Sequence, residues 1–161
     1  MGSEKNKKRK WKRNEQSSNI RDAGVTHKER VYISKKLIQL LEAECKKELP
    51  NEACGFISGH KKLCKNVWPT RNTNPSPYTF AIDIHDQDRI LGELKKNHEE
   101  LVGVYHSHPF GKAVPSNDDI KHAPGQQIYY FIIALGRGEA NIRCYKIFNG
   151  MVREVDIEIY G

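Results

Sequence analysis

The order of helix-length and strand-length apolar segments after residue 30 constrains this fold most. A helix is predicted between its capping residue Ser34 and Pro50, because apolar residues recur there at helical spacing. A second helix is expected from about His85 or Asp86 to Lys96. Short apolar runs predict strands over residues 53–58, 63–68, 78–82, 101–108, 128–135, 141–148 and 152–159. This order predicts an α/β domain with two sizeable helices around a mostly antiparallel or mixed sheet.

The length of the chain favours a single domain. It has 161 residues, of which 37% are hydrophobic, enough for one core but not for several. The dipeptide Asn149-Gly150 lies between the last two predicted strands and is typical of a tight β-hairpin. We therefore expect one folded domain over residues 31–160.

The positive charge is concentrated at the N-terminus. Residues 1–30 contain ten basic and four acidic side chains, so they carry six of the seven net positive charges. Residues 1–26 are polar and lack apolar periodicity, which predicts a basic, flexible tail. Such a tail could make weak contacts with nucleic acid or an acidic protein by releasing counterions, or it could be a solvated extension.

The sequence contains no signal for a membrane or an oxidising compartment. No apolar run is long enough to cross a bilayer, and no apolar segment follows the lysine-rich start to form a signal peptide. We therefore expect a cytoplasmic protein without a membrane partner. The four cysteines are widely spaced, form no CxxC pair and are predicted to be reduced, mostly structural thiols: Cys45, Cys54, Cys64 and Cys144.

The chemistry is densest around His106 and His108. Residues two apart on a strand face the same side, so both imidazoles should lie together at a strand end while Ser107 points away. Ser116 can cap a short helix that carries Asp119 on its first turn. Two imidazoles and one carboxylate form the donor set of a catalytic zinc site with one open position.

Each of these features also has an ordinary structural explanation. Paired strand-end histidines occur without a metal, and Ser116 with Asp119 could serve only as a helix cap. A catalytic zinc also needs a group that transfers protons, and Glu52 could supply it from the start of a neighbouring strand, although spacing alone does not select it. Cys54 is better explained as a small packed residue than as a nucleophile. His122 could form a surface pair with Asp119.

The motifs taken together resemble the JAMM (MPN+) zinc metalloprotease family, in particular its compact prokaryotic branch. The segment HSHP is followed by six residues and then S-x-x-D, and P-x-E-x-C-G lies upstream. The resemblance covers roughly residues 31–160. It implies a JAMM/MPN-like (cytidine-deaminase-like) single domain, with a central mixed β-sheet, two main flanking helices and a short helix that carries a metal ligand.

The resemblance also implies a role for each motif residue. His106, His108 and Asp119 would bind Zn²⁺, Glu52 would be the general acid/base that activates a zinc-bound water, and Ser116 would stabilise the tetrahedral intermediate. Family members that have lost activity usually lack some of these residues, whereas this sequence has all of them. The expected reaction is hydrolysis of an amide or isopeptide bond at the C-terminal Gly-Gly of a ubiquitin-like or sulfur-carrier (β-grasp) protein.

Three other functions have weaker support in the sequence. A non-catalytic MPN-type module could be recruited to nucleic acid or an acidic partner by its basic tail, but the complete motif argues against it. The DNA-repair-associated JAMM relatives have a different residue between the histidines and a different upstream segment. A zinc deaminase would need the H-x-E and P-C-x-x-C signature, which is missing.

Overall fold

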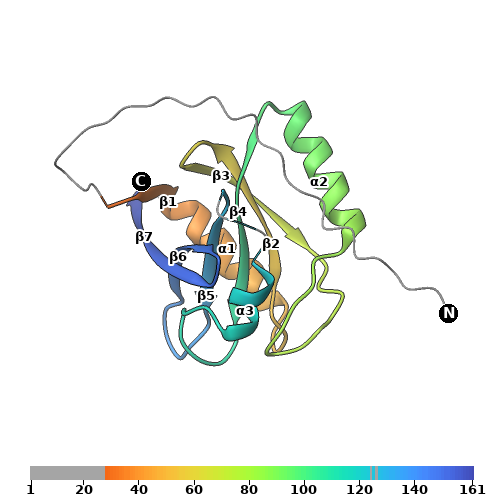
Figure 1. Cartoon of the computed structure of the whole chain (residues 1–161), viewed down its shortest axis with the longest axis vertical. Coiled ribbons are helices and arrows are strands. Elements are labelled where there is room, and N and C mark those ends of the chain that lie inside the picture. Colours follow the sequence, from red (N-terminus) through yellow and green to blue (C-terminus); the bar gives the residue numbers. More distant parts are fainter. Residues whose placement is uncertain (1–27, 124, 126) are drawn as a thin grey trace.

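Seven strands and three helices make up the part of the chain that the structure, a computed structural model, describes: residues 28–123, 125 and 127–161. Their order is shown in Figure 1. The elements are β1 (Arg30–Ser34), α1 (Lys35–Lys47), β2 (Cys54–His60), β3 (Leu63–Thr70), α2 (Ile84–Lys96), β4 (Glu100–His108), α3 (Asn117–His122), β5 (Tyr129–Ala134), β6 (Asn141–Phe148) and β7 (Met151–Tyr160).

The strands form one mixed sheet that closes on itself in the order β1-β3-β2-β4-β5-β6-β7. Four pairings are antiparallel, namely β2 with β3, β2 with β4, β5 with β6 and β6 with β7. β1 runs parallel to β7 and touches β3 only through Tyr32 and Leu63, while β4 and β5 are parallel. The predicted mixed sheet is therefore present, and it closes into a barrel, which the sequence did not predict.

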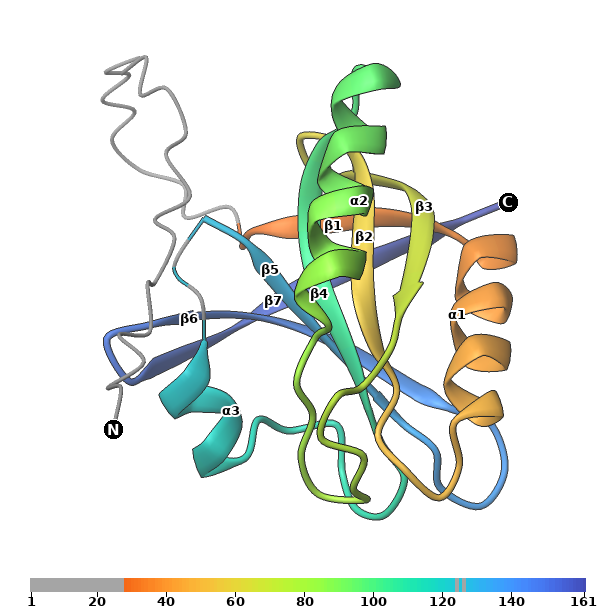
Figure 2. The ribbon, with the colours of Figure 1, turned by 90° about the vertical axis from the view of Figure 1, so that its right-hand side faces the viewer.

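The two main helices lie where their apolar faces can be covered by strands. Ser34 caps α1 by accepting a hydrogen bond from the backbone N–H of Leu37 at 3.1 Å. The buried face of α1 packs in the largest cluster of the core, together with residues of β1 and β3. Ile90 and Leu94 of α2 pack against Phe56 of β2. Figure 2 shows α2 in front of β4 and β2, with α1 and α3 on opposite sides of the strands.

One predicted strand is wrong. Residues 78–82 form an irregular loop, and their strand-like contact is an isolated bridge between Asn72 and Ile82. Two prolines directly precede this segment, at 75 and 77, and its backbone groups bond to the Asn72 side chain instead of a neighbouring strand. β1 was not predicted from the sequence, because its five residues are too few to show a clear period.

Other predictions can be compared with the structure directly. The Asn149-Gly150 turn joins β6 to β7, and all four cysteines are buried free thiols. The predicted tail of residues 1–26 lies outside the described residues. Within the described part of the chain, no helix is long and apolar enough to span a membrane.

Candidate metal and catalytic site

Two histidines converge at the end of β4. His106 and His108 lie on the same side of the strand, as their spacing predicts, and their Nε2 atoms are 3.1 Å apart. Ser107 points the other way and is buried. His106 is also buried, whereas His108 is partly exposed to solvent.

The third side chain comes from α3. Ser116 caps this helix by accepting a hydrogen bond from the Asp119 N–H at 3.0 Å, and the Ser116 N–H donates to Asp119 Oδ2 at 2.9 Å. This reciprocal pair is the capping box that the sequence predicts. It directs Asp119 Oδ2 to 3.1 Å from His106 Nε2 and 3.2 Å from His108 Nε2. The cap therefore orients the carboxylate toward both imidazoles.

These three donor atoms fit a tetrahedral metal ion. They form a nearly equilateral triangle with sides of 3.1, 3.1 and 3.2 Å. Ligands held about 2.0–2.1 Å from a tetrahedral zinc lie about 3.3 Å from one another, so a small expansion of the triangle suffices. Among the described residues, this trio is the group of histidine, cysteine and acidic side chains close enough to hold a metal.

Neighbouring groups hold both imidazoles in an orientation that suits metal binding. His108 Nδ1 lies 2.8 Å from the Lys112 carbonyl oxygen, which accepts a proton carried on Nδ1, and in the neutral ring with that tautomer Nε2 would offer its lone pair to a metal. Phe80 stacks on the His106 ring at a centroid distance of 4.6 Å. These contacts limit rotation of the two rings.

Asp119 is also attracted strongly to both imidazoles. Burial raises the pKa of Asp119, but its hydrogen bonds with His106 and His108 outweigh burial and hold the pKa well below the ordinary value. Burial lowers the pKa of His108, yet the hydrogen bond with Asp119 reverses this and raises it. The site therefore holds a carboxylate whose negative charge favours a cation between the rings.

Glu52 is a buried carboxyl group in the segment between α1 and β2. The residue is 3% exposed, and its Oε2 is buried without a hydrogen-bond partner among the described residues. Burial raises the pKa of Glu52 to about 8, although His108 counteracts part of this effect. A carboxyl group with a pKa near neutrality and an unused oxygen can accept and return a proton.

The backbone of Glu52 is anchored on two sides. On the loop side, the Glu52 N–H donates to the Ser76 carbonyl at 2.8 Å, and Asn72 Nδ2 donates to the Glu52 carbonyl at 3.0 Å. On the β4 side, the Ala53 N–H donates to Ser107 Oγ at 2.8 Å, and the Ser107 N–H donates to the Ala53 carbonyl at 3.0 Å. The residue between the two histidines thus links the Glu52 segment to the strand that carries them.

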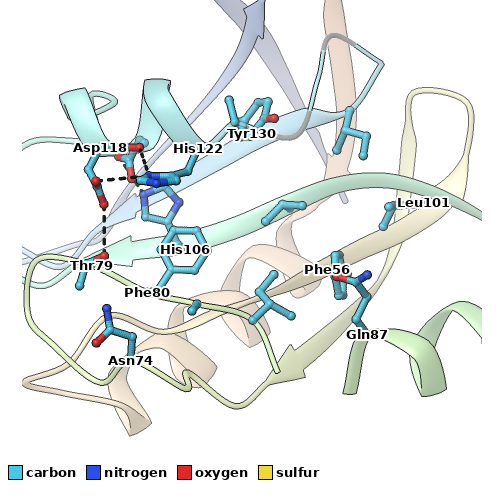
Figure 3. Close-up of a pocket in the computed structure, with 16 residues that line it drawn as sticks. Phe56, Asn74, Thr79, Phe80, Gln87, Leu101, His106, Asp118, His122 and Tyr130 are labelled. Carbon is cyan, nitrogen blue, oxygen red and sulfur yellow. Dashed lines mark hydrogen bonds and ion pairs between the residues drawn. The ribbon is translucent and has the colours of Figure 1, made fainter. Parts of the chain in front are cut away.

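A cavity of about 490 Å³ opens beside the trio, with His106 and Asp119 in its wall. Figure 3 shows it between the 74–82 loop, α2, β4 and α3. Its lining is mainly apolar and includes Phe56, Val104 and Ile128. Thr79 Oγ1 donates to Asp118 Oδ2 at 3.2 Å across the cavity, which joins the loop to α3.

Sequence reasoning missed the loop residues Asn72, Thr79 and Phe80. Their role depends on the packing of residues 72–82 against the end of β4, and no sequence motif predicts this long-range contact. Phe80, an aromatic residue within a segment rich in proline and asparagine, was the available signal that this loop packs against the domain.

Two candidates from the sequence have other roles. Cys54 is buried, its Sγ lies 3.4 Å from Thr70 Oγ1, and burial raises its pKa to about 11, which is consistent with a packed thiol. For His122, the sequence left open a position near the site or a surface pair with Asp119. His122 does line the cavity beside the trio, but it does not pair with Asp119. Its Nδ1 instead lies 3.0 Å from the Asp118 carbonyl and 3.3 Å from Asp118 Oδ1, because one helical turn places it over that residue.

Comparison with known proteins identifies the family. A family model described as prokaryotic homologs of the JAB domain matches residues 34–147, a range that contains Glu52 and the trio. The chain belongs to this prokaryotic JAB family. The compact prokaryotic JAMM/MPN branch expected from the motifs is thereby confirmed.

Named relatives and solved structures agree with this membership. The chain is 26% identical over 126 residues to the CysO-cysteine peptidase of Mycobacterium tuberculosis, covering 76% of this chain and 86% of the relative. It is 34% identical over 94 residues to a probable TtuB-protein conjugate cleaving protease of Thermus thermophilus, covering 58% of this chain and 63% of the relative.

Two structural neighbours share the JAB/MPN-like fold. The solution structure of DSY2949 from Desulfitobacterium hafniense superposes with a TM-score of 0.75 at 29% identity, covering 81% of this chain and 92% of that one. A structure described as JAMM, a metalloprotease-like zinc site in the proteasome and signalosome, superposes with a TM-score of 0.53 at 18% identity, covering 83% and 99%.

Proposed function

We propose that this protein is a zinc-dependent peptidase or isopeptidase that hydrolyses an amide bond at the C-terminal Gly-Gly of a ubiquitin-like or sulfur-carrier protein. The observation that carries the proposal is the triangle of His106, His108 and Asp119 donor atoms in the same fold as a buried, unpartnered Glu52. The names of the CysO and TtuB relatives support a carrier-protein conjugate as the substrate.

In this proposal each residue has one task. His106, His108 and Asp119 hold zinc, which supplies Lewis-acid polarisation and a more acidic water. Glu52 takes a proton from the attacking water and gives it to the departing nitrogen, a role that suits its pKa of about 8. Ser116 Oγ already accepts from the Asp119 N–H, so its own O–H is free to donate to the negative charge that develops on the substrate carbonyl oxygen.

The cavity beside His106 gives the substrate a place to bind. Its lining combines polar groups from the 74–82 loop and α3 with apolar side chains of the strands. An extended carrier tail can place its glycines at the trio because glycine has no side chain to clash there. Neighbouring residues of the substrate would then occupy the cavity.

The test is mass spectrometry of a Gly-Gly-ended β-grasp carrier joined through an amide to cysteine or to a lysine side chain. Zinc-loaded wild-type protein should release the carrier with a free Gly-Gly end. Glu52→Gln should keep zinc and lower turnover by about 10²–10⁴-fold. Glu48→Gln is the matched control, since it makes the same change at an exposed residue nearby, and it should behave as wild type.

Equal turnover by Glu52→Gln would contradict the role of Glu52. Absence of turnover on both conjugates by the zinc-loaded wild-type protein would contradict the peptidase proposal and favour a binding module of the same fold.

A further inference from the structure

The Asn72 side chain uses its complete hydrogen-bonding capacity. Its Nδ2 donates to the carbonyl oxygens of Glu52 at 3.0 Å and Thr79 at 3.3 Å. Its Oδ1 accepts from the N–H groups of Asn74 and Ala81, each at 3.0 Å. An amide offers two donor hydrogens and an acceptor oxygen with two lone pairs, and every one of them is used here.

These four bonds join two parts of the site that are distant in sequence. Three of them brace the 72–82 loop from inside, and its neck is closed by the bridge to Ile82 and by the Thr73 N–H bond to the Ala81 carbonyl at 2.8 Å. The fourth reaches out of the loop to the peptide of Glu52. Asn72 therefore couples the position of the loop to the position of the carboxyl group.

The far side of the same loop touches the metal-binding residues. Phe80 stacks on His106, and Thr79 Oγ1 bonds to Asp118, the neighbour of Asp119 on α3. A shift of the loop would therefore move Glu52 relative to the His106 ring and the cavity wall at the same time. Displacements of about 1 Å between reacting groups can reduce rates about 10²-fold.

We propose that Asn72 is a positioning residue, which sets the placement of the Glu52 carboxyl group relative to the metal trio and the cavity. The four hydrogen bonds of the Asn72 side chain go to backbone groups of Glu52 and the loop, so Asn72 acts through the Glu52 carbonyl and the loop. The inference rests on the proposed hydrolysis, because Glu52 is taken to be the proton carrier.

The test is Asn72→Asp in the full-length, zinc-loaded protein. Aspartate has nearly the same shape and keeps the two acceptor bonds, but it replaces both donor hydrogens with an oxygen that faces two carbonyl oxygens. Asn149→Asp is the matched control, since it makes the same charge change in the β6–β7 turn, where Asp-Gly is as suitable as Asn-Gly.

We expect Asn72→Asp to lower kcat for the carrier conjugate by about ten- to a hundredfold, with KM within about twofold and one zinc per chain still bound. Asn149→Asp should match wild type. Unchanged kcat, or a loss of activity explained by loss of zinc, would overturn the proposal.

A second variant is used if the first one does not fold. If Asn72→Asp does not fold, the uncharged Asn72→Ser is assayed in the same way, and failure of both to fold would assign Asn72 a purely structural role and overturn the proposal. The reference is wild-type turnover. An inactive wild type refutes the proposed function, whereas an active wild type with an equally active variant refutes only the role of Asn72.

Discussion

At the scale of single residues, the burial of Glu52 couples stability to pH. Its pKa of about 8 in the folded protein lies above the ordinary value of 4.5, so folding favours the protonated form. The resulting stabilisation is complete below about pH 4.5 and is lost as the pH rises through about 8. Each pH unit in this window costs at most about 1.4 kcal/mol.

We predict that metal-free wild-type protein loses more free energy of unfolding between pH 5 and pH 8 than metal-free Glu52→Gln does. Urea unfolding at both pH values measures this difference. Groups far from Glu52 contribute to both proteins alike, so the difference reports the Glu52 carboxyl group together with its electrostatic coupling to His108. Parallel pH dependence in the two proteins would show that the carboxyl group ionises as freely in the folded chain as in the unfolded one.

The sequence predicts the trio better than it predicts the surroundings of the trio. The spacing of His106 and His108 on a strand and the S-x-x-D cap are local patterns, and the structure brings these side chains together. Glu52 lies 54 positions from His106 and was selected only through family resemblance. Asn72 and Phe80 depend on long-range contacts of a loop, which no local period encodes.

At the scale of elements too, local patterns can be predicted from the sequence and long-range contacts cannot. Ser34 and the helical period identify α1, and a long apolar run identifies β4. Residues 78–82 have the composition of a strand, but the Thr79 carbonyl and the Ala81 N–H bond to the Asn72 side chain, and the strand-like pairing of the segment is one isolated bridge at Ile82. Local propensity is outweighed there by the tertiary contacts.

The 72–82 loop also forms one wall of the cavity, which permits a test of substrate binding. Ala81 lines the cavity, and its backbone rather than its side chain bonds to Asn72. We predict that Ala81→Phe fills part of the cavity and raises KM for the carrier conjugate at least about tenfold, with zinc retained. Ala43→Phe, on the exposed face of α1, is the control. Steady-state kinetics decide, and an unchanged KM would place the substrate elsewhere.

At the scale of the whole molecule, barrel closure holds the site together. β4 carries both histidines and lies between β2, which follows Glu52, and β5. The largest buried cluster fills the space behind them and joins α1 to strands from both ends of the chain. Closure could not be predicted from the sequence, because it depends on the parallel pairing of the first and last strands.

Phe131 of β5 is completely buried in this cluster. We predict that Phe131→Ala lowers the free energy of unfolding by about 3–5 kcal/mol, because it removes buried apolar surface and leaves a void. Denaturant unfolding of the metal-free protein measures the loss. A cost below about 1 kcal/mol would mean that the core around β5 collapses around the missing ring.

The most direct test of the central claim is the zinc content of purified wild-type, Asp119→Ala and Glu52→Gln proteins after equilibration with zinc and removal of the excess. Three ligands and a separate proton carrier predict one zinc per chain in wild type and Glu52→Gln, and loss of that zinc in Asp119→Ala. Stoichiometric zinc in Asp119→Ala, or its absence from the wild-type protein, would contradict the assignment of the trio.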